Sequence, residues 1–152
     1  MLPNVFEGSS YLTIDSKWRF AVPVKYREAL REPSDGKVVL TVHPHGYLML
    51  YPLRDWLPIR DRIDNFSGVD AGASMWKRLM MGCAEHQILD ATTGRLLITQ
   101  VHRKFAGLGE EIVFIGQGAH IQIWDVAAWE EQATQAKTVQ IRLPSGAEDM
   151  KF

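Results

Sequence analysis

The sequence predicts an α+β fold in which two copies of one small β-rich module pack together as a pseudo-dimer within one chain. The main observation is a repeat, because residues 12–23 and 87–98 share the same order of an apolar run, a charged turn and a second apolar run. Each copy continues with two further apolar runs and then a tryptophan, Trp56 or Trp129. A duplication of this length is typical of two modules joined in tandem.

The size and composition of the chain indicate that the two modules share one core. The chain has 152 residues, of which 46% are hydrophobic and 23% are charged, as in a folded globular protein. Each copy spans only about 45 residues, which is too few to bury a large core alone. We therefore expect apolar residues of both copies to pack against one another.

In the first copy the pattern predicts two short strands, a helix and a hairpin. The apolar runs at residues 11–14 and 20–22 lie so close together that residues 15–19 form a tight turn. Pro23 suits the first turn of a helix. The remaining elements are a helix at residues 24–30 and strands at residues 37–42 and 47–51, joined by a turn at residues 43–46.

The second copy repeats this plan. Thr99 is a good N-cap for a short helix through Phe105, and Gly107 suits the end of that helix. The strands are expected at residues 87–89, 96–98, 111–115 and 121–124.

Between the copies, two apolar stripes at helical spacing predict a helical hairpin. The stripes consist of Trp56, Ile59, Ile63 and Phe66, and then of Trp76, Leu79, Met80 and Cys83. We expect Pro58 in the first turn of its helix, because proline disrupts a helix interior. Both stripes are more typical of a core or a subunit interface than of a cofactor site, and Cys83 is expected to be a buried thiol.

The sequence after the second copy predicts a terminal helix followed by a tail. Asp125 is a good N-cap for a helix over residues 126–137, and the tail from residue 143 is expected to be loose. The predicted organisation is module 1 at residues 8–56, a helical linker at 57–83, module 2 at 84–128, and the C-terminal helix and tail at 129–152.

Three features of the sequence indicate a cytoplasmic protein without a membrane partner. Cys83 is the only cysteine, which excludes an internal disulfide. The longest apolar run is shorter than the roughly 18 residues that a membrane-spanning helix needs. Residues 1–4 carry no basic segment, and no apolar segment of the signal-peptide kind follows them.

The net charge of −1 does not by itself favour nucleic acid as a partner, but the charges are unevenly distributed. Residues 17–31 contain one acidic residue, Glu28, and five basic residues, which are Lys17, Arg19, Lys25, Arg27 and Arg31. A basic face on a near-neutral protein is compatible with binding a polyanion. An ordinary solvated surface is the alternative.

Each copy places an aspartate shortly before the arginine of its tight turn. Asp15 stands four residues before Arg19, and Asp90 stands five residues before Arg95. A carboxylate so placed can hold the guanidinium by two parallel hydrogen bonds, and a fixed arginine suits both phosphate contact and guanine readout. The alternative is a surface ion pair worth ~0–1 kcal/mol.

Short motifs along both copies carry a resemblance to a known family. In the first copy they are Phe6-x-Gly8, Asp15-Ser16-Lys17-x-Arg19, Val22-Pro23, Tyr26-Arg27 and Leu50-Tyr51-Pro52-Leu53-x-x-Trp56. In the second they are Gly94-Arg95-Leu96-Leu97-Ile98, Phe105-Ala106-Gly107-Leu108, Gly116-Gln117 and Ile123-Trp124-Asp125. Together they resemble the MraZ family of regulators, which consist of two AbrB/SpoVT-type modules.

This resemblance implies a fold, an assembly and a function. It implies two swapped-hairpin modules wrapped as an intrachain pseudo-dimer, and a ring-shaped homo-oligomer. It also implies sequence-specific binding of double-stranded DNA at direct repeats upstream of the division and cell-wall gene cluster, usually as a repressor of its own operon. The DNA-contacting motif of the family maps onto Asp15 and Arg19, so we expect Arg19 to contact DNA on the nucleoid, Asp15 to orient it and Lys17 to add charge.

The sequence departs from the family pattern in both turns. Trp18 stands where the family usually has a glycine before its arginine, so either this turn avoids a positive φ or the strain is tolerated. We expect Trp18 to pack against its own hairpin or a neighbouring subunit, with stacking on a sugar or base as the alternative. The extra residue between Asp90 and Arg95 is expected to break the pairing geometry, which leaves Arg95 as the weaker DNA contact.

Two further arginines stand eight residues after the turn arginines. Arg27 is expected to support the fold or to bind phosphate from its short helix. Arg103, together with His102, is a candidate for phosphate contacts from the second copy.

The sequence contains no arrangement typical of an enzyme, so we expect no catalytic activity, cofactor, metal ion or small-molecule substrate. His43 and His45 flank a proline and are interpreted as part of a turn. The alternative function is an antitoxin-like or scaffold module that binds a partner protein through the helical linker and the acidic tail. DNA binding weakens steeply as the salt concentration rises, whereas partner binding weakens much less.

Overall fold

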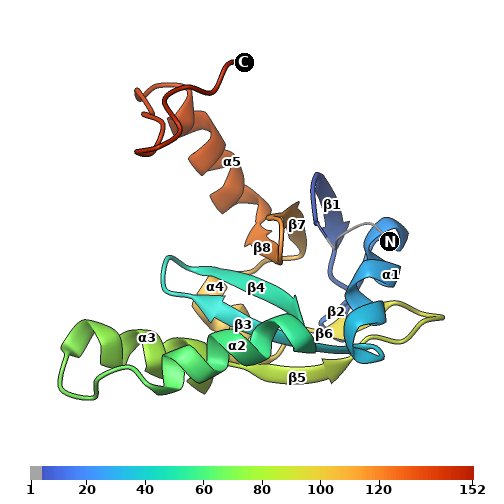
Figure 1. Cartoon of the computed structure of the whole chain (residues 1–152). Coiled ribbons are helices and arrows are strands. Elements are labelled where there is room, and N and C mark those ends of the chain that lie inside the picture. The colour runs from blue at the N-terminus through green and yellow to red at the C-terminus, as the bar shows by residue number, and fades with distance from the viewer. Residues whose placement is uncertain (1–4) are drawn as a thin grey trace.

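The computed structural model describes residues 5–152 of the chain, and the predicted lack of a signal peptide concerns residues 1–4, which lie outside the described range (Figure 1). The first module contains β1 (Ser9–Thr13), β2 (Arg19–Ala21), α1 (Val24–Arg31), the 3-10 turn η1 (Glu32–Ser34), β3 (Lys37–His43) and β4 (Tyr47–Pro52). The second contains β5 (Glu85–Ile88), β6 (Arg95–Leu97), α4 (Gln100–Ala106), β7 (Glu111–Gly116) and β8 (Ile121–Asp125). Helices α2 (Leu53–Asp64) and α3 (Ala71–Gly82) lie between the modules, and α5 (Val126–Ala136) follows the second.

The order of the strands confirms the predicted α+β pseudo-dimer. The six-stranded antiparallel sheet runs β1-β7-β8-β4-β3-β5, and β2 pairs with β6 in a separate two-stranded ribbon. Because β1, β3 and β4 are the equivalents of β5, β7 and β8 in the repeat, the order is the same from either end. Each module thus gives its first strand to the third strand of the other module, since β1 pairs with β7 and β5 pairs with β3.

The larger core lies between one face of this sheet and the β2–β6 ribbon, with α1 and α4 alongside. It contains residues of both modules, among them Phe20, Leu40, Leu48, Leu96, Ile98, Phe114 and Ile121. Phe20 of the ribbon meets Phe114 of β7 edge to face, with 5.4 Å between the ring centroids. Aromatic pairs of this geometry stabilise a core beyond the area they bury. The shared core agrees with the short length of each module.

The opposite face of the sheet is covered over β3 and β4 by the α2–α3 hairpin. Trp56 of α2 and Met80 of α3 are buried there against Val39, Met49 and Tyr51 of the strands. The buried hydroxyl of Thr41 donates to the carbonyl oxygen of Met80 at 2.6 Å, so this polar group is paired. Alternate residues of β3 therefore face two different apolar clusters, as a strand buried on both faces requires.

Pro58 lies inside α2, and the expectation that it marks the first turn of its helix is wrong. The helix begins at Leu53, directly after Pro52, so Pro58 is its sixth residue. The proline removes only the hydrogen bond to the carbonyl of Arg54, which lies near the exposed start of the helix. Burial of Trp56 and Ile63 on the inner face stabilises the helix despite this loss.

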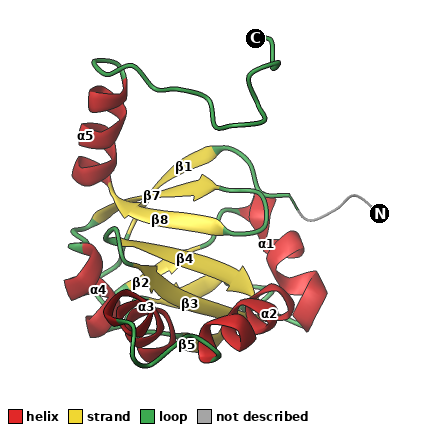
Figure 2. Ribbon diagram, turned by 60° about the vertical axis from the view of Figure 1, so that its left-hand side comes forward, coloured by secondary structure: helices red, strands yellow, loops and turns green. Residues whose placement is uncertain are grey.

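Helix α5 has a different environment from α2, its equivalent in the repeat. It starts at Val126, and the side chain of the preceding Asp125 accepts a hydrogen bond from the backbone N–H of Ala128, as predicted for an N-cap. Every residue of α5 is partly or fully exposed, and the helix projects away from the sheet (Figures 1 and 2). Within residues 5–152, the helices are too short or too polar to cross a membrane.

Gly94 provides a test of how closely the two modules pack. It has φ +63°, and a Cβ atom at this position would collide with Nε and Cζ of Arg27 from the other module. We expect Gly94→Ala to lower the free energy of unfolding by about 2–4 kcal/mol, from left-handed strain and displacement of the arginine. Urea denaturation monitored by circular dichroism measures the loss.

Gly118→Ala is the matched control, because Gly118 has φ +75° but open space around its Cα. We expect it to cost only the strain of about 1–2 kcal/mol. Equal losses for the two variants would contradict the close packing of Arg27 on Gly94.

Candidate nucleic-acid interface

The β2–β6 ribbon places arginines of both modules on one exposed face. In its antiparallel register Arg19 is opposite Leu97, Phe20 is opposite Leu96, and Ala21 is opposite Arg95. Phe20 and Leu96 are buried in the core, so their neighbours in each strand point the other way. Arg19 and Arg95 therefore share the outer face, where Arg95 is exposed and Arg19 is half-buried.

The turn before β2 is held mainly by the backbone. The Oδ1 atom of Asp15 accepts hydrogen bonds from the N–H groups of Lys17 at 2.8 Å and of Arg19 at 2.9 Å. The N–H of Asp15 donates to the carbonyl oxygen of Arg19 at 2.8 Å, and that of Trp18 donates to the carbonyl oxygen of Asp15 at 3.0 Å. These four bonds fix the backbone on both sides of the exposed Lys17 side chain.

The predicted two-bond pairing of Asp15 with the Arg19 guanidinium is wrong. Nε of Arg19 lies 3.4 Å from Oδ2 of Asp15, an ion-pair distance, but Nε has no hydrogen-bond partner within residues 5–152. The reason is that Oδ1 is already occupied by two backbone N–H groups, which sets the orientation of the carboxylate. Asp15 thus places Arg19 chiefly by fixing its backbone.

The environment lowers the pKa of the Asp15 carboxyl below its usual value of 3.8. The largest cause is the hydrogen bond from the backbone N–H of Arg19; partial desolvation opposes it, and the N–H of Lys17 and the charges of Arg19 and Arg95 lower the pKa further. The charge of Arg95 is the smallest of these causes, and Arg95 lies on the same outer face of the ribbon as Arg19.

The second turn has a different geometry. Oδ1 of Asp90 accepts from the N–H groups of Thr92 at 2.7 Å and Thr93 at 2.9 Å, whereas in the first turn the second donor is the N–H of the arginine itself. Within residues 5–152, Asp90 forms no ion pair with Arg95. This is the geometry expected from the extra residue in this turn. The Arg95 side chain therefore has no carboxylate beside it to limit its motion.

Trp18 adopts the left-handed conformation that the family usually gives to glycine, with φ +61°. Its carbonyl oxygen accepts a hydrogen bond from the N–H of Ile98 at 2.8 Å, and its ring packs against the larger core. The guanidinium carbon of Arg103 lies 4.1 Å from the ring centroid. This cation–π contact, worth ~0.5–2 kcal/mol, offsets the ~1–2 kcal/mol of backbone strain. Trp18 thus packs within its own chain.

The remaining residues that the sequence suggested as phosphate contacts bond to or pack against other parts of the chain. Nε of Arg27 donates to the carbonyl oxygen of Val22 at 2.7 Å, which agrees with a role in the fold. Arg103 is half-buried on Trp18. A phosphate contact by His102 is excluded, because its ring is buried and its Nε2 lies 2.6 Å from the carbonyl oxygen of Cys83. Cys83 itself is half-buried rather than buried, and partial burial raises the pKa of its thiol.

Sequence reasoning missed the contact between Trp18 and Arg103. The signal was present, because Trp18 replaces a glycine and Arg103 is the equivalent of Arg27, the arginine that covers the glycine of the other turn. Within residues 5–152, the structure contains no cluster of three or more side chains suited to hold a metal ion. The candidate interface therefore consists of Arg19 and Arg95 on the outer face of the ribbon and of Asp15, Lys17, Trp18 and Arg103 at the first turn.

Comparison with known proteins decides the family. A family model described as "MraZ protein, putative antitoxin-like" matches residues 5–79 and again residues 80–145. The chain belongs to the MraZ family. Relatives named "Transcriptional regulator MraZ" include those of Methylobacillus flagellatus, 42% identical over 95% of this chain and 97% of the relative, and Delftia acidovorans, 40% identical over 97% and 100%. That of Azoarcus sp. is 39% identical over 95% of this chain and 98% of the relative.

The MraZ match bears on the repeat and on the class of protein. The family model matches the chain twice, in agreement with the repeat seen in the sequence and in the sheet. The names of the MraZ relatives are those of regulators, so the family is not one of enzymes.

The depressed pKa of Asp15 gives a pH test of the turn. Because the pKa is lowered in the folded protein, the ionised carboxylate and its two backbone bonds persist as the pH falls past 3.8 and are lost only below it. We expect the NMR titration midpoint of the Asp15 carboxyl carbon below 3.8. In Arg19→Ala it rises only in part, because the backbone N–H groups remain. A midpoint at or above 3.8 in the folded wild type would contradict the hydrogen-bonded turn.

Proposed function

We propose that this protein is a sequence-specific DNA-binding transcriptional regulator of the cytoplasm and nucleoid. Its proposed action is to repress its own operon by binding direct repeats upstream of the division and cell-wall gene cluster. The observation that carries the proposal is the exposed face of the β2–β6 ribbon, on which Arg19 and Arg95 lie from the two modules, with the exposed Lys17 in the turn before β2. The names of the relatives support the same function.

Each residue of the interface has a proposed role. Arg19 contacts a guanine edge or a phosphate, for which the planar guanidinium is suited. Lys17 neutralises a phosphate beside it, and Asp15 holds the backbone from which both side chains project. Arg95 is the weaker contact, because its turn lacks the ion pair. Direct contacts by Arg27 and Arg103 receive no support, since these guanidinium groups pack on Gly94 and Trp18.

Assembly of several copies explains how a chain with a net charge of −1 binds DNA tightly. One turn that presents two or three cations binds weakly. Several turns on the rim of a ring contact successive repeats, and each further contact benefits from a high effective concentration, which raises the avidity by up to ~10²–10⁴-fold. Only the rim of such a ring needs to be basic.

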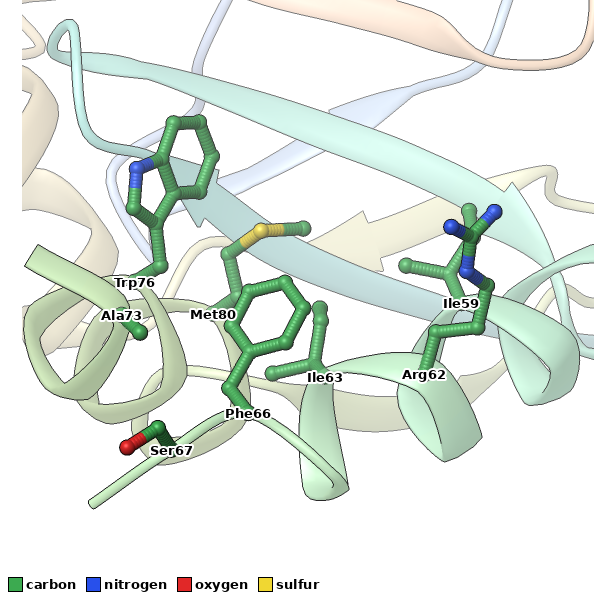
Figure 3. Close-up of a pocket in the computed structure, with 8 residues that line it drawn as sticks. All are labelled: Ile59, Arg62, Ile63, Phe66, Ser67, Ala73, Trp76 and Met80. Atoms are coloured by element: carbon green, nitrogen blue, oxygen red, sulfur yellow. The ribbon is translucent and has the colours of Figure 1, made fainter. Parts of the chain in front are cut away.

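We propose that the ring forms through an apolar groove between α2 and α3 and helix α5 of a second copy. The groove encloses about 600 Å³ and is lined by Ile59, Arg62, Ile63, Phe66, Ser67, Ala73, Trp76 and Met80, whose side chains converge on it (Figure 3). Helix α5 is the equivalent of α2 but projects from the sheet, whereas α2 is covered by α3. Arg62 at the groove complements Glu130 and Glu131 of α5. A contact between two different surfaces generates a ring when its rotation closes.

A partner protein in the same groove is the second candidate, and the antitoxin-like description of the family favours it. Salt discriminates the two functions. Binding to repeat-containing DNA falls steeply with salt because each phosphate contact releases counterions. An affinity that changes little with salt would favour the protein partner.

Arg19→Ala tests the proposed DNA contact. We expect it to lower the affinity for the promoter of the operon by at least about 100-fold, because a bidentate or phosphate contact is lost in every copy of the ring. Arg95→Ala is expected to lower it by about ten-fold or less. Gel-shift titration measures both, and Arg142→Ala is the control, since Arg142 is an exposed cation of the C-terminal tail, outside the β2–β6 ribbon and the α2–α3 groove. Normal promoter binding by Arg19→Ala would refute the assignment, and an equal loss in Arg95→Ala would show that the two modules contribute equally to the DNA contact.

Phe66→Asp tests the assembly surface. Phe66 is 39% exposed at the groove, so a carboxylate there leaves the fold intact but opposes burial of the groove against a second copy. We expect light scattering to show a shift from the ring toward the monomer. Val69→Asp is the matched control in the same loop, because Val69 is 97% exposed and lies outside the groove. An unchanged mass for Phe66→Asp would exclude the groove as the contact.

A further inference from the structure

The residue before the arginine has a left-handed φ in both turns that lead into the ribbon. Trp18 and Gly94 have φ +61° and +63°. The carbonyl oxygen of each accepts a hydrogen bond from the opposite module, from the N–H of Ile98 at 2.8 Å and from that of Val22 at 2.7 Å. The two positions therefore share a left-handed φ and a hydrogen bond across the modules, but they differ in their side chain.

The arginine that covers each position responds to this side chain. Arg27 occupies the space above Gly94, and its Nε donates to the carbonyl oxygen of Val22 at 2.7 Å. At the other turn, the indole of Trp18 fills this space, and the guanidinium of Arg103 lies over the ring at 4.1 Å. Nε of Arg103 is buried and has no hydrogen-bond partner within residues 5–152. Arg103 thus stacks on Trp18, whereas Arg27, its equivalent in the first module, donates a hydrogen bond to a backbone carbonyl.

We propose that Trp18 and Arg103 are positioning residues that hold the first turn in its DNA-contacting shape, an inference that rests on the proposed DNA-binding function. Trp18 stands between Lys17 and Arg19, so its backbone angles set the directions of both cationic side chains. The guanidinium of Arg103, from α4 of the other module, stacks on the indole and limits its motion. A turn ordered before binding loses less conformational entropy when it binds DNA.

The stack is one of two contacts that distinguish the first turn from the second. The first turn carries both the Asp15–Arg19 ion pair and the Trp18–Arg103 stack, whereas the second turn carries neither. The guanidinium carbon of Arg103 lies 4.1 Å from the indole centroid, and its Nε is buried without a hydrogen-bond partner within residues 5–152. The effect of Arg103 on DNA binding is therefore expected to pass through Trp18 and not through a phosphate.

A double-mutant cycle tests this inference. The variants are Trp18→Gly, Arg103→Ala and the two together, and the probe is a labelled duplex that carries the repeats upstream of the operon. Glycine tolerates φ +61°, so Trp18→Gly keeps the fold. We expect each single change to weaken binding by about ten-fold and the double variant to be no weaker than either single one. The slope of log affinity against log salt stays unchanged, because no phosphate contact is lost.

Three further variants separate positioning from charge and from packing. Lys104→Ala removes an exposed cation from the same helix and is expected to bind like the wild type. Arg103→Lys keeps the charge but loses the planar stack, so it is expected to bind as weakly as Arg103→Ala. Trp18→Leu keeps an apolar side chain against the core but loses the aromatic face, so it is expected to bind as weakly as Arg103→Ala, a loss that packing alone does not explain.

Several results would overturn the inference while leaving the proposed function intact. The first is wild-type affinity in Trp18→Gly or Arg103→Lys. The second is additive losses in the double variant, which would indicate that Trp18 touches DNA itself. The third is a salt slope reduced by about one in Arg103→Ala, which would indicate a phosphate contact. If the wild type fails to bind the repeats, or if Arg19→Ala binds them normally, the proposed function fails instead.

Discussion

The exchange of strands between the two modules is the constraint on which the rest of the structure depends. Neither module completes a sheet alone, since β1 needs β7 and β5 needs β3 as its partner. The β2–β6 ribbon likewise takes one strand from each module and closes the shared core with Phe20 and Leu96. The arginine-bearing face therefore exists only when both modules are folded, and unfolding of one module removes the site from the other.

The site derives its order from the backbone more than from pairs of charges. Asp15 accepts two N–H bonds and has only a long ion-pair contact with Arg19, which is typical of an exposed pair of low intrinsic stability. The carbonyl of Trp18 bonds to Ile98 across the modules, so the turn is also tied to the ribbon. The side chain of Arg19 projects from a fixed position, while its own outer end remains available to a ligand.

Most elements of the fold were predictable from the sequence because their signals are local. The apolar runs place the strands close to their observed bounds. The bounds of the helices follow from the N-caps Thr99 and Asp125 and from the terminating Gly107. The pairing of strands between modules followed from the family resemblance and not from periodicity. The position of Pro58 was misjudged, because burial of Trp56 and Ile63 on the far side of the helix outweighs a lost hydrogen bond.

The candidate site was predictable in its residues but less so in its geometry. The repeat identifies Asp15, Arg19 and Arg95, yet it does not reveal that the Asp15 carboxylate is occupied by backbone N–H groups. The burial of His102 and the stack of Arg103 on Trp18 depend on contacts between distant segments of the chain. Such contacts are set by the packed fold and have no local signature.

The covalent link between the modules has a genetic consequence. In a dimer of identical chains, one codon specifies both turns, so a substitution and its strain appear twice. Here Trp18 and Gly94 are encoded separately at structurally equivalent positions, and the strain of the tryptophan occurs once. Each turn is free to evolve while the other preserves the fold, so selection can give the two halves of one binding surface different tasks.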